Sequence, residues 1–420
     1  MRPFDWDFSA PRSAAIGDHD VPIVSEHLKG RRIALLVCGG IAAMKTPALA
    51  RALRRRGADV TAFCSSEALH YVGREALEWS TCNPLVTQLT WRAEHLSDGT
   101  PFDAYLVAPA TYNTIGKAAA GIADGVVTAA LASAFGKMQA GRTAVLFAPT
   151  MHGTMHHALL ERNCRTLAAL GARFVTPRDA YGKHNLPDEE VLVAAVCRAL
   201  STSPLRGRTA LVTAGPTPVP IDGVRRILNR FRGRLGAAVH EELLLRGADS
   251  TLLLGDGAWR PASWLPVEVA RTYDEYKAAV LAHAAKQPEI GIFSAGVADY
   301  RPKQAAAGKI PSGQAELQLT LEPTEKVIDL AAAAAPGMYV VSFKYQEGIS
   351  HEALLDIARN RLDRYPVVIA NRGEESAGRA QTAYIVTRDS TTRVEGKGAI
   401  AAAIADQLEA RFSDPDAAPR

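Results

Sequence analysis

The stretch that most constrains the fold runs from Tyr105 to Gly125, because an apolar run ends there and polar residues begin. The run stops at Pro109, and small hydrogen-bonding residues follow at Thr111, Asn113 and Thr114. A ligand site at the carboxyl end of a parallel strand needs a turn of this kind. An ordinary strand-to-helix turn capped by Asn113 is the competing interpretation.

The residues behind this turn are too small to fill a core by themselves. They are Gly116, Ala119, Ala120, Gly121 and Ala123. Such residues predict close approach by another helix, another subunit or a flat ligand.

Length and composition predict a globular chain with more than one domain. The 420 residues correspond to roughly two to three domains at about 150 residues each. Hydrophobic residues make up 47% of the chain and charged residues 22%, which is the balance of a soluble globular protein. The net charge of +4 is small for this length. It gives no reason to expect a nucleic-acid partner, whereas a phosphate-bearing substrate needs only a local basic cluster.

The cysteines and the N-terminal sequence bear on the cellular compartment of the protein. Five cysteines without a CxxC pair argue against a disulfide framework or a structural zinc site and for reducing conditions. No apolar stretch approaches the ~18 residues that span a bilayer. The first 30 residues are acidic and have no apolar signal core, so they resemble neither a secretion signal nor a transit peptide. We expect a cytoplasmic protein with no membrane partner, and we interpret residues 1–30 as an N-terminal arm.

Two more strands in the first half end in small polar residues. The apolar run Arg32–Val37 is followed by Cys38-Gly39-Gly40 and then by a helix from about Ala42 to Arg56. Two glycines before a helix let backbone N–H groups approach a phosphate, although a plain tight turn explains them equally. The next strand, Asp59–Phe63, ends in Cys64-Ser65-Ser66. These ends should meet at one edge of a parallel sheet.

A further strand, Ala144–Ala148, precedes a histidine-rich segment. His152 and His156 are four residues apart and could share a helical face, as metal ligands do. No acidic third ligand is nearby, so polar contacts or surface exposure are the preferred interpretation, and we predict no bound metal there.

Three motifs in this half resemble one family of flavoproteins. They are Gly39-Gly40-Ile41-Ala42 with Lys45, Pro109-Ala110-Thr111-Tyr112-Asn113-Thr114, and Pro149-x-Met151-His152-x-x-Met155. The family oxidatively decarboxylates a C-terminal cysteine, and the motifs look most like those of the phosphopantothenoylcysteine decarboxylases, which bind FMN. The resemblance implies flavin contacts by Gly39, Gly40, Ser65, Thr111 and Asn113, substrate contacts by Met151 and His152, and catalysis by His95.

These residue types suit the chemistry that the resemblance implies. Oxidation of the substrate thiol to a thioaldehyde by hydride transfer to FMN makes the adjacent carboxylate a good leaving group, because the carbanion is delocalised as an enethiolate. A histidine such as His95 would orient or deprotonate the reacting groups. Without the motifs, His95 would be interpreted as a surface loop residue.

Two positions depart from the family pattern. The family usually has asparagine where His152 stands, although an imidazole can also donate a hydrogen bond to a carboxylate. Many members carry a cysteine in a glycine-rich flap that protonates the enethiolate. Here the flap, Arg178–Pro187, has no cysteine and offers Tyr181, Lys183 and His184. We expect His184 to replace the cysteine, because its ordinary pKa is nearest neutrality, and a surface position of this residue is the competing interpretation.

The second half begins a new α/β pattern after the linker Ser201–Pro204. A strand at Arg208–Thr213 leads into the turn Ala214-Gly215-Pro216-Thr217-Pro218. The densest basic cluster of the chain follows, before an amphipathic helix, and consists of Arg225, Arg226, Arg230, Arg232 and Arg234. Charge runs are usually solvated, but beside a glycine turn and a helix start this cluster favours an anion site.

The second half resembles the phosphopantothenate-cysteine ligases. The resemblance rests on the turn at Gly215, Asp222, Asn229-x-x-x-Gly233, Ser294-Ala295-Gly296-Val297-Ala298-Asp299-Tyr300-Arg301-Pro302 and Gly308-Lys309-Ile310. It implies that Asn229 positions an acyl-nucleotide intermediate, that Asp299 and Gly215 contact the nucleotide, and that Lys309 stabilises charge on the activated phosphate. Mg2+ would accompany the triphosphate.

Three further positions match nucleotide-binding positions of these ligases: Phe343, Arg361 and Arg364. CTP-using bacterial members tend to have lysines where the two arginines stand, and the surrounding sequence looks closer to the ATP-using eukaryotic ligases. The choice between CTP and ATP is therefore left open.

Together the two resemblances identify the chain as similar to the bifunctional decarboxylase and ligase enzymes of coenzyme A biosynthesis. They imply two three-layer Rossmann-like α/β domains with mostly parallel sheets, the first flavodoxin-like. We expect an FMN-binding decarboxylase domain at 31–200 and a ligase domain at 207–412. The family also implies a homo-oligomer, with trimer contacts in the first domain and dimer contacts in the second. Two alternatives are a ligase with a non-catalytic flavin-binding regulatory domain and a flavoprotein that decarboxylates a peptide's C-terminal cysteine.

Overall fold

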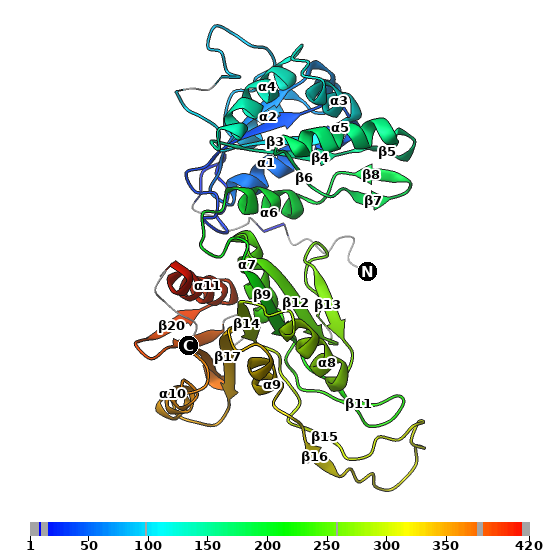
Figure 1. Cartoon of the computed structure of the whole chain (residues 1–420), viewed down its shortest axis with the longest axis vertical. Coiled ribbons are helices and arrows are strands. Elements are labelled where there is room, and N and C mark those ends of the chain that lie inside the picture. The colour runs from blue at the N-terminus through cyan, green and yellow to red at the C-terminus, as the bar shows by residue number, and fades with distance from the viewer. Residues whose placement is uncertain (1–7, 10–15, 97–98, 258, 376–380, 414–420) are drawn as a thin grey trace. The chain divides into compact units, whose positions relative to one another are not determined.

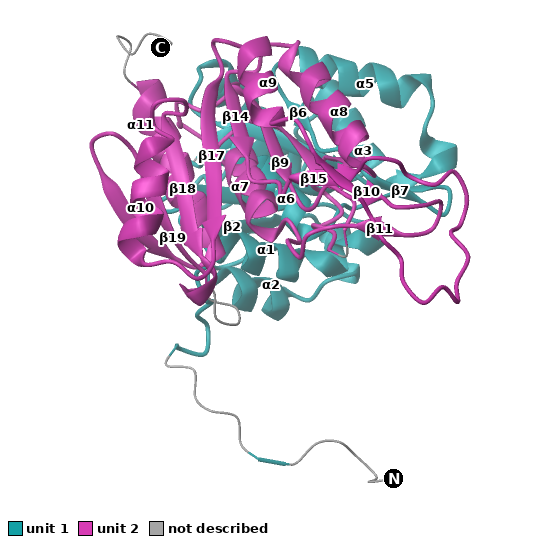
Figure 2. Ribbon diagram, turned by 90° about the horizontal axis from the view of Figure 1, so that it is seen from below, with its two compact units in different colours: residues 1–200 teal, residues 201–420 magenta. Residues whose placement is uncertain are grey.

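The computed structural model describes residues 8–9, 16–96, 99–257, 259–375 and 381–413. The chain divides into two compact units, residues 1–200 and residues 201–420 (Figure 2). Each unit is a mixed α/β structure. Within the described residues, every helix is too short or too polar to cross a membrane.

Unit 1 is built on a five-stranded parallel sheet with the order β2-β1-β3-β4-β6 (Figure 1). Its strands are β1 (Arg32–Val37), β2 (Asp59–Cys64), β3 (Ala104–Ala110), β4 (Ala144–Pro149) and β6 (Arg173–Phe174). Its α-helices are α1 (Thr46–Arg54), α2 (Arg74–Thr81), α3 (Tyr112–Ala119), α4 (Val126–Gln139), α5 (Ala158–Ala169) and α6 (Glu189–Leu200). Short 3-10 helices occur at η1 (Ile41–Lys45), η2 (Ser66–His70) and η3 (Gly153–Met155). A separate three-stranded sheet contains β5 (Met151–His152), β7 (Arg178–Ala180) and β8 (Lys183–Asn185).

Helices cover both faces of this sheet, which explains why its central strands are continuously apolar. Every residue of β3 is buried. Alternate residues of one strand serve different cores: Leu36 packs with side chains of α3, α4 and α5, whereas Leu35 is buried outside that cluster. The packing therefore confirms the expected layered α/β fold.

The strand order places a switch point between β1 and β3. From β1 the chain moves outward to β2, then returns to the other side of β1 and continues through β3 and β4. The helices that follow β1 and β3 leave in opposite directions at such a point, and a crevice opens outside the carboxyl ends of the two strands. The turns at Gly39-Gly40 and at Thr111 lie at these ends.

The structure corrects one expected helix start and one expected capping residue. The helix expected from Ala42 to Arg56 begins as the 3-10 helix η1, and the regular helix α1 starts at Thr46, where Pro47 suits the first turn because its missing N–H is not needed. The cap of α3 is Thr111, whose Oγ1 accepts from the Thr114 backbone N–H at 3.4 Å. The cap interpretation of Asn113 is therefore wrong.

Of the small residues behind Thr111, Gly116 lies against a helix, whereas Ala120, Gly121 and Ala123 are exposed. α3 packs on α5, and a Cβ atom added at Gly116 would lie 3.7 Å from Asn163 Nδ2. The expected close approach of a helix is therefore seen at Gly116, and for the exposed residues the expected partner stays a prediction.

Part of the segment before β1 packs onto unit 1. Leu28 is completely buried, and its backbone N–H donates to Arg56 O at 2.8 Å. The Val24 backbone N–H donates to Arg55 O at 2.8 Å. Residues 24–28 therefore bind to the end of α1; the arm interpretation of residues 1–7 and 10–15 falls outside the described residues.

Unit 2 contains an eight-stranded sheet with the order β13-β12-β9-β14-β17-β18-β19-β20. These strands are β9 (Thr209–Ala214), β12 (Asp249–Gly255), β13 (Val267–Ala270), β14 (Ile290–Phe293), β17 (Tyr339–Gln346), β18 (Val367–Arg372), β19 (Thr382–Val386) and β20 (Thr391–Glu395). The α-helices are α7 (Arg234–Leu245), α8 (Tyr273–Ala284), α9 (Val327–Ala334), α10 (His351–Asn360) and α11 (Lys397–Ser413), and a 3-10 helix, η4, covers Gly373–Glu375. Two small hairpins consist of β10 (Val219–Pro220) with β11 (Arg226–Ile227) and of β15 (Tyr300–Pro302) with β16 (Leu321–Pro323).

The large sheet is parallel from β13 to β18 and antiparallel at β19 and β20. Side chains of β9 alternate between two cores: Val212 packs with α7 and α11, and Leu211 packs with α8 and α9. The strand order reverses between β9 and β14, so a second switch point lies at their carboxyl ends. There Pro216 and Gly296 form a parallel bridge.

Candidate functional site

At the carboxyl edge of unit 1, glycines let three turns meet. A Cβ atom at Gly39 would lie 3.1 Å from the backbone carbonyl carbon of Glu67, and closer still to its Cβ. At Gly40 the added Cβ would lie 3.5 Å from Thr111 Cγ2. The backbone N–H of Ser65 donates to Val37 O at 3.0 Å. The turns after β1, β2 and β3 therefore form one surface, as the sequence predicts.

The polar groups of this edge suit a flat phosphate-bearing cofactor. Ser65 Oγ accepts from the Ala68 N–H at 3.3 Å, and Asn113 is exposed in the first turn of α3. The donors at this edge are the two glycine backbone amides, the hydroxyl groups of Ser65 and Thr111, and the side-chain amide of Asn113. Donors of this kind bind phosphate and the polar edge of a ring system. Cys38 lies behind them, and burial raises the pKa of its thiol to about 11, so the group stays protonated at neutral pH.

His95 lies in the segment between α2 and β3, outside these three turns in the sequence. The side chain is half-buried, and its Nδ1 atom is buried without a hydrogen-bond partner. Lys137 of α4 donates to the carbonyl oxygen of the next residue, Leu96. The loop that carries His95 is thus fixed to a helix.

The flap is a β-hairpin that pairs with the segment after β4. β7 and β8 are joined by Tyr181 and Gly182, with φ angles of 56° and 66°, as a two-residue hairpin turn requires. β8 pairs with β5, which places Met151 opposite His184. Met151 is buried, whereas His152 is exposed and its Nδ1 lies 2.9 Å from Thr154 Oγ1.

The flap also contains a cluster that joins two histidines distant in sequence. His184 Nδ1 lies 2.6 Å from Asp179 Oδ1. His184 Nε2 lies 2.7 Å from His156 Nδ1. The helical face that the spacing of His152 and His156 allowed does not form, because His152 is in β5 and His156 follows η3 in extended conformation.

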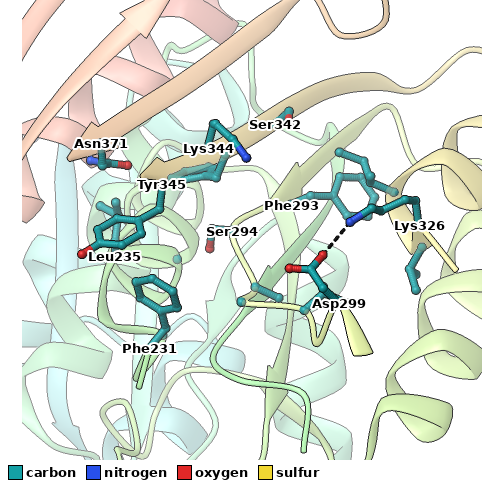
Figure 3. A pocket seen from close by; sticks show the side chains of 18 of the residues that line it. Phe231, Leu235, Phe293, Ser294, Asp299, Lys326, Ser342, Lys344, Tyr345 and Asn371 are labelled. Carbon is teal, nitrogen blue, oxygen red and sulfur yellow. Dashed lines mark hydrogen bonds and ion pairs between the residues drawn. The ribbon is translucent and has the colours of Figure 1, made fainter. Parts of the chain in front are cut away.

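In unit 2, a cavity of about 1100 Å³ opens at the second switch point (Figure 3). The start of α7, the segment after β14, the end of β17 and the residues after α10 all line it. Its volume is that of a site for a drug-sized or larger ligand. Among the residues expected to bind nucleotide, Asp299, Phe343, Arg361 and Arg364 line this cavity.

Cationic groups gather on one side of the cavity. Arg361 Nη2 donates to Ser342 Oγ at 2.7 Å, and its guanidinium lies 5.3 Å from the centre of the Tyr365 ring. Arg361 Nε is buried without a partner. Burial, together with the charge of Arg361, lowers the pKa of Lys344. An anion bound here would give both groups a partner, so the donor set fits phosphate.

Two pairs of side chains flank the cavity in Figure 3. On one side Lys326 Nζ lies 2.6 Å from Asp299 Oδ1. On the other, the rings of Phe231 and Tyr345 meet edge to face, with centroids 4.9 Å apart. Asp299 is 67% exposed despite its ion pair, so it is accessible to a ligand.

Asn229 lies beside the cavity wall. Its Nδ2 donates to Gly296 O, and its Oδ1 accepts from the Phe231 N–H at 3.2 Å. A Cβ atom at Gly296 would lie 2.6 Å from Asn229 Nδ2. The absence of a side chain at position 296 therefore allows this amide to approach the turn after β14.

The basic cluster is largely neutralised. Arg225 pairs with Asp222, Arg226 with Asp256 and Arg230 with Glu347. Arg232 and Arg234 line the cavity at the start of α7. Three of the five guanidinium groups thus bind carboxylates of the protein, but Arg230, Arg232 and Arg234 line the cavity, so the anion site at this cluster stays a prediction.

Lys309 and Gly215 are not among the described residues that line the cavity. Lys309 is exposed in the loop after β15. Asp222 fixes the adjoining residue, because its Oδ2 accepts from the Ile310 N–H at 3.0 Å. Hydrogen bonds from the Arg225, Val224 and Ile310 amides lower the pKa of Asp222 to about 2.

The motif analysis missed several lining residues, among them Lys326, Ser342, Tyr345 and Tyr365. Ser342 and Tyr345 belong to β17, next to the matched residue Phe343. Their place near the carboxyl end of a strand was the available signal. Lys326 and Tyr365 lie in other segments of the chain, and their approach to the cavity depends on the tertiary fold.

Comparisons with known proteins cover both units. The flavoprotein family matches residues 22–201, and the C-terminal domain of the DNA/pantothenate metabolism flavoproteins matches residues 205–412. The coenzyme A biosynthesis bifunctional protein CoaBC of Thermococcus kodakarensis is 36% identical over 372 residues, which cover 87% of this chain and 91% of the relative.

The protein of the same name from Mycolicibacterium smegmatis is 33% identical over 359 residues, 80% of this chain and 84% of the relative. A solved structure, the DNA/pantothenate metabolism flavoprotein from Streptococcus pneumoniae, is 25% identical with a TM-score of 0.45, covering 49% of this chain and 99% of that one.

Proposed function

The chain belongs to the family of bifunctional coenzyme A biosynthesis proteins, CoaBC, and from this premise we propose how its two units divide the work. It is a bifunctional enzyme, a phosphopantothenate-cysteine ligase and a phosphopantothenoylcysteine decarboxylase. Unit 2 activates 4'-phosphopantothenate with a nucleoside triphosphate and couples it to cysteine. Unit 1 decarboxylates the product to 4'-phosphopantetheine. The observation that carries the assignment of ligation to unit 2 is the phosphate-suited cavity at its switch point.

In unit 2 the triphosphate binds beside Arg361, Lys344 and the start of α7. Arg361 Nε is the buried donor that lacks a protein partner, and the first amides of α7 add an anion-binding helix terminus. Mg2+ neutralises the remaining phosphate charge. Asn229 presents its amide beside the turn after β14, where it holds the acyl-nucleotide intermediate.

Lys309 stabilises the charge of the activated phosphate when its loop reaches the cavity. Lys309→Ala and Asn229→Asp should each lower ligase turnover roughly 10²-fold or more, as loss of a positioned electrostatic group does. Lys303→Ala is the matched control, since Lys303 is also exposed on the β15–β16 hairpin loop. Normal ligation by Lys309→Ala would remove the anhydride role from this residue.

In unit 1 the crevice at β1 and β3 holds FMN. The glycine amides at Gly39 and Gly40 would bind the phosphate, and Ser65, Thr111 and Asn113 would hold the polar parts of the cofactor. FMN supplies the two-electron oxidation of the cysteine thiol that makes decarboxylation possible. His95 orients or deprotonates the substrate, and Met151 and His152 flank the substrate carboxylate.

The flavin assignment has a direct test. Freshly purified protein should be yellow, and Gly39→Ala should lose bound flavin because its new methyl group meets Glu67. Gly73→Ala is the control, since a Cβ atom there would meet nothing within 4 Å. A colourless wild-type protein that stays colourless after FMN is added would contradict the assignment.

The assembly and the nucleotide are further parts of the proposal. The protein is a homo-oligomer of the cytoplasm. The oligomer is supported by large apolar side chains exposed near Gly40, such as Ile41 at 69% and Met44 at 62%, since such patches mark interaction sites. ATP and CTP are distinguished by parallel ligase assays. A chain that ligates but never decarboxylates would instead have a regulatory flavin domain.

A further inference from the structure

The flap contains a hydrogen-bonded chain of three titratable side chains: Asp179, His184 and His156. Asp179 Oδ1 lies 2.6 Å from His184 Nδ1, and His184 Nε2 lies 2.7 Å from His156 Nδ1. The two imidazole rings have centroids 4.9 Å apart. His184 lies in β8, and His156 follows η3, which comes directly after the strand β5 that pairs with β8. The two histidines are 28 residues apart, so the sequence gives no sign of their contact.

These contacts fix which nitrogen carries each proton. A carboxylate accepts hydrogen bonds, so the Nδ1 atom of His184 must be its N–H donor to Asp179. In neutral His184, Nε2 is then an acceptor, and it receives the Nδ1–H of His156. Both ring nitrogens of His184 are therefore engaged, and the nitrogen left for a ligand is Nε2 of His156.

The hydrogen-bonded chain of side chains lies on the same edge of unit 1 as the turns after β1, β2 and β3. β5 directly follows β4, and the Thr150 N–H donates to Ala110 O at 3.0 Å. The neighbouring residue His157 lies against Tyr112, the residue after Thr111, with ring centroids 5.6 Å apart. The segment that carries His156 is thus attached to the turn after β3.

We propose that His156, rather than His184, is the acid that protonates the substrate in the second half of decarboxylation. His184 and Asp179 are positioning residues behind it. This proposal rests on the decarboxylase function proposed above. The enethiolate left after loss of CO2 needs one proton on the carbon that carried the carboxylate, and one hydride, returned from the reduced flavin, on the carbon that bears sulfur.

The proton that the substrate gains comes from a side chain of the protein. The electron pair of the enethiolate forms the new C–H bond, the Nε2–H bond of the His156 imidazolium breaks, and neutral His156 remains with its proton on Nδ1. The substrate becomes a thioaldehyde, which the hydride converts to the thiolate of the product. Asp179 and neutral His184 stabilise the imidazolium before transfer, as carboxylate–histidine pairs do.

The first test follows the two half-reactions with phosphopantothenoylcysteine supplied to the whole chain. His156→Ala should slow phosphopantetheine formation ~10²-fold, the contribution of a general acid, and should accumulate the oxidised enethiol together with reduced flavin. His184→Ala should slow it roughly tenfold, since His156 keeps its free nitrogen. Tyr181→Phe and Lys183→Met, which remove other flap protons, should turn over normally.

The second test needs no turnover. Diethyl pyrocarbonate modifies accessible unprotonated imidazole nitrogens, and mass spectrometry locates the adduct. In the wild type His156 should react faster than His184, and in His156→Phe the reaction of His184 should speed up because its Nε2 is released. Equal reaction of both histidines in the wild type would contradict the hydrogen-bonded chain.

The outcomes separate the two levels of the proposal. Normal turnover by His156→Ala, or a greater loss in His184→Ala than in His156→Ala, would overturn the role of His156 alone. A wild-type protein that makes no phosphopantetheine would overturn the decarboxylase function, and the role of His156 with it.

Discussion

Substitution of Gly236 by alanine should destabilise unit 2, and the contacts around this residue allow the loss of stability to be estimated. Gly236 is the third residue of α7 and lines the cavity. A Cβ atom there would lie 2.6 Å from Ala214 Cβ and 3.2 Å from Thr213 O, and closer still to Ser294 Oγ. Ala214 Cβ cannot rotate away, so helix α7 must shift from β9.

Overpacking of this kind destabilises by about 1–3 kcal/mol. Replacing glycine by alanine within a helix offsets about 1 kcal/mol of that, so the net loss should be about 0–2 kcal/mol relative to the wild type and about 1–3 kcal/mol relative to a glycine-to-alanine change without a clash. Gly398→Ala in α11 is the matched control, since its Cβ would meet nothing within 4 Å. It should leave stability unchanged or raise it slightly.

The assay is urea unfolding that is monitored by hydrogen exchange of peptides from α7 and β9. A local probe is needed because the two units need not unfold together. Gly236→Ala should unfold at lower urea than the wild type and bind nucleotide more weakly, while its decarboxylation of supplied substrate stays normal. An unfolding midpoint equal to that of Gly398→Ala would refute the packing argument.

Three further outcomes are expected. His95→Asn should stop decarboxylation and leave ligation unchanged, which separate assays of the two half-activities will show. Arg361→Met should lower ligase kcat/KM roughly 10²-fold, because it removes the buried cationic donor of the cavity, and dissection of kcat and KM with varied nucleotide checks this. Burial lowers the pKa of His240 to about 4, below its ordinary value of about 6.5. The free energy of unfolding should therefore fall by on the order of 3 kcal/mol as pH falls from about 6.5 to about 4. His240→Gln should weaken this pH dependence in urea titrations at several pH values.

The sequence was sufficient for features fixed by neighbouring residues. The apolar runs predicted β1, β3 and β9 to within one or two residues at each end, because buried parallel strands leave a continuous apolar signal. The turns at Gly39 and Thr111 could be placed on one edge, since the carboxyl ends of parallel strands must meet there.

Features that depend on distant residues could not be predicted in this way. His156 and His184 are 28 residues apart, and their contact arises from the pairing of β5 with β8. The helical spacing of His152 and His156 suggested the wrong relation, because η3 interrupts the segment. In unit 2, the ion pairs of the arginine cluster with Asp256 and Glu347 could not be predicted, because these carboxylates come from other parts of the chain.

The central claim is that one chain carries out both ligation and decarboxylation. The most direct measurement is incubation of the purified protein with 4'-phosphopantothenate, cysteine, Mg2+ and either ATP or CTP, with mass detection of both possible products. The account predicts 4'-phosphopantetheine with at least one of the nucleotides. Phosphopantothenoylcysteine that accumulates without decarboxylation, or no product with either nucleotide, would contradict it.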